Sequence, residues 1–206
     1  MKVAVSILSS NYDELKTIEM INQTDADYIH VDVMDGKFVK EKTPNYEHLH
    51  KSEKKLNVHL MTSNPFNYIS KYSLLNTESI IISSEIDDDI ASLIEFIHSR
   101  GLKAGLAISP STKVERIVPY LHKIENVIVM TVEPGKGGQK LLESTLYKID
   151  ILRKYREEKK YNYDIIVDGG VNDETIGKVK NADIVVAGSY ICKSNNFSEK
   201  ISNLRL

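Results

Sequence analysis

The chain has 206 residues, of which 41% are hydrophobic and 27% charged, and its formal net charge is −2. This is enough for a full core in one domain over residues 1–206, and the near-neutral charge excludes the basic surface of a nucleic-acid or anionic-membrane binder. No segment approaches the ~20 apolar residues of a membrane span, and the single cysteine, Cys192, excludes an intrachain disulfide. We therefore expect a cytoplasmic protein without nucleic-acid or membrane partners.

Eight short segments rich in Val, Ile or Leu predict β-strands along the chain. In chain order they are Val3–Ile7, Tyr28–Asp32, Leu56–Met61, Ser79–Ser83, Lys103–Ala107, Val127–Val132, Ile165–Asp168 and Ile184–Ala187. Helix-like segments lie between them: Tyr12–Ile21, Pro65–Leu75, Asp89–Arg100, Lys113–Tyr120, Ser144–Glu157, Asp173–Lys180 and Phe197–Leu204. Between Asp35 and Leu56 the composition predicts a long polar loop with at most a short helix.

This alternation predicts an α/β fold with a parallel sheet. Eight strands are the number that closes a (β/α)8 TIM barrel, which at this length is a compact single domain. The alternative is a doubly wound open sheet. No Gly-rich dinucleotide fingerprint follows the first strand, so we favour the barrel.

Four side chains with metal-binding chemistry lie at or near the carboxyl ends of predicted strands. Because residues i and i+2 of a strand share a face, His30 and Asp32 project the same way. His59 and Asp168 come from the third and seventh strands, at the same end of the barrel. Each residue alone is explained as well by a satisfied core or turn position. Together, two imidazoles and two carboxylates suit one divalent ion such as Zn, Fe, Mn or Co.

Three Gly-rich turns follow the last three strands and indicate a phosphate site. They read VEPGKGGQ over Val132–Gln139, DGG over Asp168–Gly170 and AGS over Ala187–Ser189. Glycine allows backbone N–H groups to approach an anion closely, and the hydroxyl of Ser189 adds a donor. Any one of these turns is explained by an ordinary strand-to-helix connection. Three at one rim of a barrel favour a phosphate ligand.

The sequence at these positions resembles the ribulose-phosphate 3-epimerase family. The matching stretches follow the family order over almost the whole chain. They are SILS at 6–9, IHVDVMDG at 29–36 with KFV at 37–39, VHLM at 58–61, MTVEPGKGGQ at 130–139, VDGGV at 167–171 and AGS at 187–189. The resemblance implies a (β/α)8 barrel that acts as an isomerase, interconverting D-ribulose 5-phosphate and D-xylulose 5-phosphate.

The resemblance also implies roles for individual residues. His30, Asp32, His59 and Asp168 correspond to the ligands of one divalent metal ion, and Asp32 and Asp168 to the paired acid and base. The substrate-contacting positions correspond to Ser6, Met34, His59, Met61, Met130, Gly137, Gly138, Gly169, Gly170, Gly188 and Ser189. The implied partners are a phosphorylated ketose and further copies of the chain, as a dimer or a hexamer.

Several loops depart from the family pattern. Lys136 stands where Phe is usual, and Lys40–Tyr46 reads KEKTPNY where Pro-Asn followed by Gly is common. Residues 83–85 read SSE in place of His-x-Glu, and residues 109–110 read SP in place of Asn-Pro. The metal and acid/base positions are intact, so we expect the epimerisation chemistry. The altered loops leave the identity of the sugar phosphate undecided.

The alternatives differ in substrate or in class. The nearest is a 3-epimerase of a hexulose phosphate such as D-allulose 6-phosphate. A metal-independent sugar-phosphate decarboxylase is a second, but the sequence contains no Asp-x-Lys-x-x-Asp. A non-catalytic sugar-phosphate binding barrel is the third, and the intact ligand set argues against it.

Overall fold

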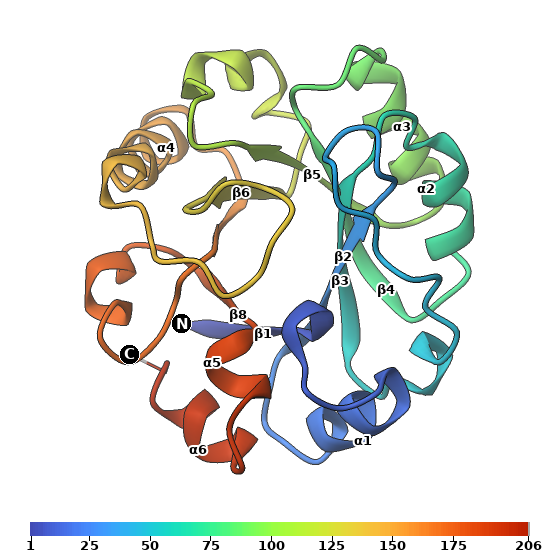
Figure 1. The fold of residues 1–206 in the computed structure, drawn as a ribbon. Helices are drawn as coiled ribbons and strands as arrows, with labels where there is room; N and C mark the ends of the chain where they lie inside the picture. The colour runs from blue at the N-terminus through green and yellow to red at the C-terminus, as the bar shows by residue number, and fades with distance from the viewer. Residues whose placement is uncertain (206) are drawn as a thin grey trace.

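Eight parallel strands close into a barrel in chain order in a computed structural model, which describes residues 1–205 (Figure 1). The strands are β1 (Lys2–Ser6), β2 (Tyr28–Met34), β3 (Lys55–Met61), β4 (Thr77–Ser83), β5 (Lys103–Ile108), β6 (Asn126–Met130), β7 (Asp164–Asp168) and β8 (Ile184–Ala187). Because β1 pairs with both β2 and β8, the open-sheet alternative is wrong and the barrel is confirmed.

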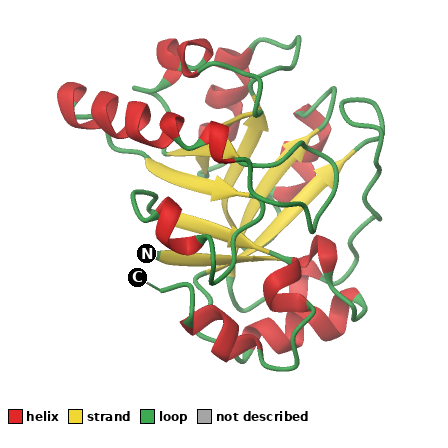
Figure 2. Cartoon of the chain, turned by 60° about the vertical axis from the view of Figure 1, so that its left-hand side comes forward, coloured by secondary structure: helices red, strands yellow, loops and turns green. Residues whose placement is uncertain are grey.

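The helices form a ring outside the strands (Figures 1 and 2). The α-helices are α1 (Glu14–Asn22), α2 (Phe66–Tyr72), α3 (Ile90–Ser99), α4 (Tyr147–Lys159), α5 (Ser189–Cys192) and α6 (Phe197–Ser202). The 3-10 helices are η1 (Ile7–Ser9), η2 (Leu49–Lys51), η3 (Val114–Arg116), η4 (Val118–Tyr120), η5 (Glu143–Thr145) and η6 (Ile176–Val179). None of the helices in residues 1–205 is long and apolar enough to cross a membrane.

Two connections differ from the expected helices for local reasons. The segment Lys113–Tyr120 forms η3 and η4 rather than one α-helix. Pro119 has no N–H to donate to the carbonyl four residues earlier, so a continuous α-helix would lose a bond there. In Asp173–Lys180 only η6 forms, since Gly177 disfavours a regular helix at its centre. In the described loop between β2 and β3, the only helix is η2, as expected.

Apolar side chains pack in two layers around the strands. The inner layer fills the barrel with Ala4, Ile81, Ala107, Ile128, Met130, Val132, Ile166, Ile184 and Val186. The outer layer lies between strands and helices, where Ile94 and Ile97 of α3 are fully buried against it. Successive strand residues alternate between these layers, which directs one residue in two of each strand toward the interior.

Strand register brings polar positions together at one end of the interior. Ser6 lies opposite His30, Asp32 opposite His59, and Met130 opposite Asp168. The arrowheads in Figure 2 end on the side away from the two termini, where long loops cover the barrel. The polar residues at the strand ends therefore lie beneath these loops.

Gly105 on β5 gives a test of interior packing. A Cβ atom there would lie 2.6 Å from Cγ1 of Ile81 and 2.9 Å from the Asn126 carbonyl oxygen. Overpacking of this kind costs about 1–3 kcal/mol, so Gly105→Ala should lower the free energy of unfolding by that amount in urea titration. Gly177→Ala is the matched control, since a Cβ there meets nothing within 4 Å and should leave stability unchanged or slightly raised. Equal stabilities of the two variants would contradict the packing argument.

Candidate metal centre and phosphate-binding cavity

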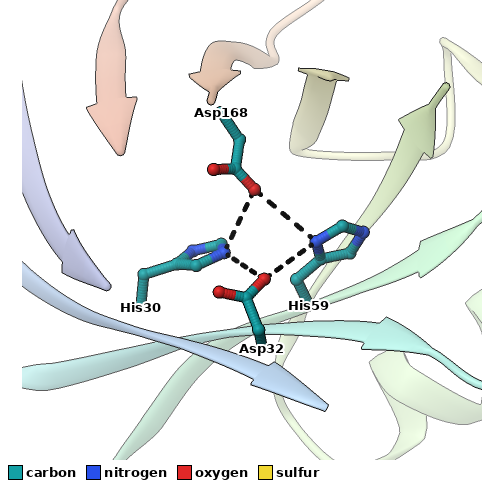
Figure 3. Close-up of side chains that lie close together, drawn as sticks. All are labelled: His30, Asp32, His59 and Asp168. Atoms are coloured by element: carbon teal, nitrogen blue, oxygen red, sulfur yellow. Dashed lines mark ion pairs between the residues drawn. The ribbon is translucent and has the colours of Figure 1, made fainter. Parts of the chain in front are cut away.

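His30, Asp32, His59 and Asp168 converge on one point inside the barrel (Figure 3). His30 and Asp32 are two residues apart on β2, His59 is on the neighbouring strand β3, and Asp168 ends β7. Their exposed fractions are 0%, 5%, 1% and 9%, so all four are buried. The expected convergence from three strands is therefore present.

The spacing of the ligand atoms matches a metal polyhedron. Asp32 Oδ1 lies 3.3 Å from His30 Nε2 and 3.4 Å from His59 Nδ1, and Asp168 Oδ2 lies 3.6 Å and 3.7 Å from the same nitrogens. Tetrahedral bonds of about 2.0–2.2 Å give ligand-to-ligand edges of roughly 3.3–3.6 Å. Within the described residues, those two nitrogens have no hydrogen-bond partner although they are buried. The residues present thus fit a divalent ion.

Charge balance leads to the same conclusion. Burial acts to lower the pKa of both imidazoles, but the Asp32 and Asp168 carboxylates outweigh it, raising the pKa of His30 to about 10 and that of His59 above its usual value. Burial acts to raise the pKa of the two carboxyls, and the imidazoles outweigh it and lower both pKa values. The buried carboxylates therefore require positive charge between them, which two imidazolium protons or one divalent cation can supply.

A buried hydrogen-bond chain orients His30. Its Nδ1 lies 2.7 Å from Oδ1 of Asn57, and the Asn57 amide nitrogen donates to the Ser79 hydroxyl at 2.7 Å. An amide oxygen only accepts, so His30 donates through Nδ1. Its Nε2 faces the two carboxylates, where it can carry a proton or bind a cation. Such outer partners fix the tautomer and direction of metal-ligating imidazoles.

Asp32 is also held on its other oxygen. The Ser6 hydroxyl donates to Oδ2 at 2.9 Å, while Oδ1 faces the two imidazoles. One oxygen of the carboxylate thus faces the ligand set and the other faces β1. This gives Ser6 a direct contact with a candidate acid/base group.

A cavity of about 620 Å³ opens above the cluster at the carboxyl end of the barrel. Most of the sequence-predicted site residues line it: Ser6, Asp32, Met61, Met130, Gly137, Gly138, Asp168, Gly169, Gly170, Gly188 and Ser189. His30 and His59 lie beneath its floor, and Met34 is buried at the last position of β2. The cavity therefore extends from the two aspartates to the Gly-rich turns.

The three Gly-rich turns meet at one side of this cavity. Gly138, Gly169 and Gly170 have positive φ angles of 76°, 122° and 69°, a region that side chains disfavour. A Cβ atom on Gly138 would lie 3.9 Å from the Ser189 hydroxyl oxygen, which brings the turns after β6 and β8 together. Lys140 and Lys193 also line the cavity and suit an anionic ligand, while Lys136 and Lys178, which line it too, pair with Glu41 and Glu143.

Some residues of the site were missed by sequence reasoning. Asn57 and Ser79 are the outer partners of His30. The i, i+2 rule places Asn57 on the same face as His59, and that spacing is the only signal that points to it. Ser9 contacts the cavity beside Gly137, and its role depends on how the first connection folds back over the barrel.

The chain is similar in sequence to proteins of one named family. The chain matches the model of the Ribulose-phosphate 3 epimerase family over residues 2–192. It is 37% identical to the ribulose-phosphate 3-epimerase of Helicobacter pylori (strain J99), over 100% of this chain and 97% of that protein. It is 36% identical to the enzyme of that name from Bacillus subtilis (strain 168), over 100% of this chain and 98% of that protein. In fold it is similar to a solved tryptophan synthase from Mycobacterium tuberculosis, with a TM-score of 0.66 and 14% identity over 98% of this chain and 88% of that one.

The Asn57 contact generates a prediction about metal affinity. Asn57→Ala removes the acceptor for His30 Nδ1 without removing a ligand, so the dissociation constant for a divalent ion should rise about 10–100-fold. Competition titration against a chromophoric chelator measures it. Asn22→Ala, which removes a half-buried side chain that donates to the Lys51 carbonyl far from the site, should leave the constant unchanged. An unaltered constant in Asn57→Ala would show that His30 does not depend on this contact.

Proposed function

The chain belongs to the ribulose-phosphate 3-epimerase family, and we propose that it interconverts D-ribulose 5-phosphate and D-xylulose 5-phosphate through an enediolate. It is thus an isomerase that acts on phosphorylated sugars. The observation that carries the proposal is the placement of Asp32 and Asp168 at the floor of one cavity, on strands β2 and β7. The cavity also contains the Gly-rich turns suited to a phosphate.

Epimerisation next to a ketone requires two proton transfers on opposite faces of a planar intermediate. One group removes the proton from C3, and a second returns a proton to the other face. Asp32 and Asp168 approach the floor from different strands, so a sugar carbon between them has one carboxyl group on each side. In the reverse direction the two aspartates exchange roles.

The proposed cofactor is one divalent ion, Zn, Fe, Mn or Co, held by His30, Asp32, His59 and Asp168. When bound, it supplies positive charge that stabilises the negative charge developing on the oxygen atoms of the enediolate. An aspartate with a pKa of about 4 is a weak base in water, so it can remove the C3 proton only if that proton is made more acidic. Ser6 keeps Asp32 oriented through its 2.9 Å hydrogen bond.

The remaining predicted contacts divide between the sugar and the phosphate. Met61 and Met130 line the cavity near the aspartates, where flexible, polarizable side chains can pack against a flat intermediate. We assign Met34 to the same group, behind them. Backbone N–H groups of Gly137, Gly138, Gly169, Gly170, Gly188 and the Ser189 hydroxyl are assigned to the phosphate. Binding there orients the sugar without taking part in the proton transfers.

The test is a coupled assay of the purified, metal-supplemented protein on D-ribulose 5-phosphate. We expect turnover that is lost with a chelator and restored by adding back a divalent ion. D-Allulose 6-phosphate is assayed in parallel, because Lys40–Tyr46 departs from the family pattern beside the substrate. Turnover of the hexulose phosphate alone would keep the chemistry and reject the pentulose. No turnover of either would reject the proposed function.

The two-aspartate mechanism predicts the behaviour of single variants. Asp32→Asn and Asp168→Asn should each lower kcat by at least about 10²–10⁴-fold, because each removes a proton-transfer group. The assay is run at saturating metal so that weaker metal binding does not account for the loss. Asp87→Asn, the same change on an exposed loop, should retain full activity. Near-normal turnover in either site variant would eliminate that aspartate as acid or base.

A further inference from the structure

Loops from opposite strands of the barrel contact each other across the cavity mouth. The β2 loop (residues 36–42) follows β2 and the β6 loop (residues 131–142) follows β6. In the closed order of eight strands, β2 and β6 are four positions apart and therefore face each other across the ring (Figure 1). A contact between their loops must span the mouth.

Glu41 makes this contact with both of its carboxylate oxygens. Oε1 lies 3.3 Å from Nζ of Lys136. A Cβ atom on Gly135 would lie 2.6 Å from Oε2 of Glu41, so the carboxylate occupies the space that a side chain there would need. Gly135 has φ +116°, which also requires glycine. One carboxylate thus packs against two successive residues of the β6 loop.

Hydrogen bonds also fix the conformation of each loop, so the contact joins two ordered loops. Asp35, between β2 and the β2 loop, accepts hydrogen bonds from the backbone of Lys37 and Phe38 and from the backbone and hydroxyl of Ser63 on the next connection. Burial acts to raise the pKa of Asp35, but these donors outweigh it and lower the pKa to about 2, so the carboxylate stays ionised. In the β6 loop, the Gln139 amide donates to the carbonyls of Glu133 and Lys136.

The residues after Lys136 are those assigned to the phosphate. Gly137 and Gly138 line the cavity, and Gly138 lies beside Ser189 on the turn after β8. A hold on Gly135 and Lys136 therefore restrains the direction of the next two backbone N–H groups. Given the function proposed above, on which the assignment rests, we propose that Glu41 is a positioning residue that holds the β6 loop across the mouth for the substrate's phosphate.

The exposure of the pair fits a contact that also opens. The Lys136 side chain is 73% exposed and that of Glu41 33%. Ion pairs this exposed shift an equilibrium by a few-fold rather than lock it. A mouth bridged by such a pair can release to admit a substrate into the 620 Å³ cavity. The hold thus biases the loop without closing the site permanently.

The sign of one substitution separates positioning from simple electrostatics. Glu41→Gln removes a negative charge near an anion site, which through the electric field alone would tighten phosphate binding. Positioning predicts the opposite. We expect the dissociation constant of inorganic phosphate, measured by calorimetry on the metal-loaded protein, to rise about three-fold. The KM for D-ribulose 5-phosphate should rise equally while kcat stays unchanged. Unchanged or tighter phosphate binding would overturn the proposal.

Two further variants test the route of the effect. In the Lys136→Met background, Glu41→Gln should weaken phosphate binding less than it does in the wild type, because the ion pair is already absent. Glu158→Gln is the matched control, since it breaks the exposed pair with Lys154 on α4 and should change nothing. An equal effect of Glu41→Gln in both backgrounds would overturn the route through Lys136. Thermal unfolding of each variant verifies that the fold is retained.

The phosphate titration also keeps the two proposals separate. It requires no turnover, so a wild type that binds phosphate but does not convert D-ribulose 5-phosphate rejects the epimerase function alone. If Glu41→Gln then still weakens phosphate binding, the positioning role stands. Turnover by the wild type without any effect of Glu41→Gln rejects the positioning role alone. A wild type that binds no inorganic phosphate rejects the assignment of the β6 loop to a phosphate.

Discussion

Two buried carboxylates with lowered pKa values impose the constraint on which this site depends. Asp32 and Asp168 lie at the floor of the cavity, only 5% and 9% exposed, where solvent stabilises their charge little. The imidazoles of His30 and His59 are the groups beside them that can carry a positive charge. One nitrogen of each imidazole and one oxygen of each carboxylate have the spacing of a metal polyhedron. The need for a compensating cation thus accounts for the two imidazoles beside the two carboxylates and for the Asn57 contact that orients one of them.

The barrel separates rigid from adjustable parts of the site. The ligands lie within strands β2, β3 and β7, whose backbones are bonded to neighbours on both sides, so their relative positions vary little. The Gly-rich turns that we assign to the phosphate lie in the loops above, where glycine backbones can approach a ligand. Proton transfer requires the rigid strands, because the reacting atoms must be held at short, fixed distances. Substrate entry requires loops that can adjust.

Sequence periodicity predicted the parts of the site that depend on single strands. His30 and Asp32 follow from the i, i+2 rule, and the eight apolar segments predict the ring that brings His59 and Asp168 to them. The contacts between Asn57 and Ser79, and between Glu41 and Lys136, depend on which strands are adjacent and which are opposite. The arrangement of strands is a property of the tertiary structure, so patterns within single segments do not predict these contacts. The α-helix expected over Lys113–Tyr120 was wrong, and Pro119 was the local signal against it.

Lys136 and Lys40–Tyr46 are departures from the family pattern in separate parts of the sequence, and in three dimensions they meet. Glu41 belongs to the second departure and pairs with Lys136, the first. A charge introduced at the mouth of a cavity for an anion alters the field there unless a partner balances it. A neutralised pair alters the field little and still joins the two loops. The two segments thus form one interaction, an ionic contact that joins the β2 and β6 loops across the mouth.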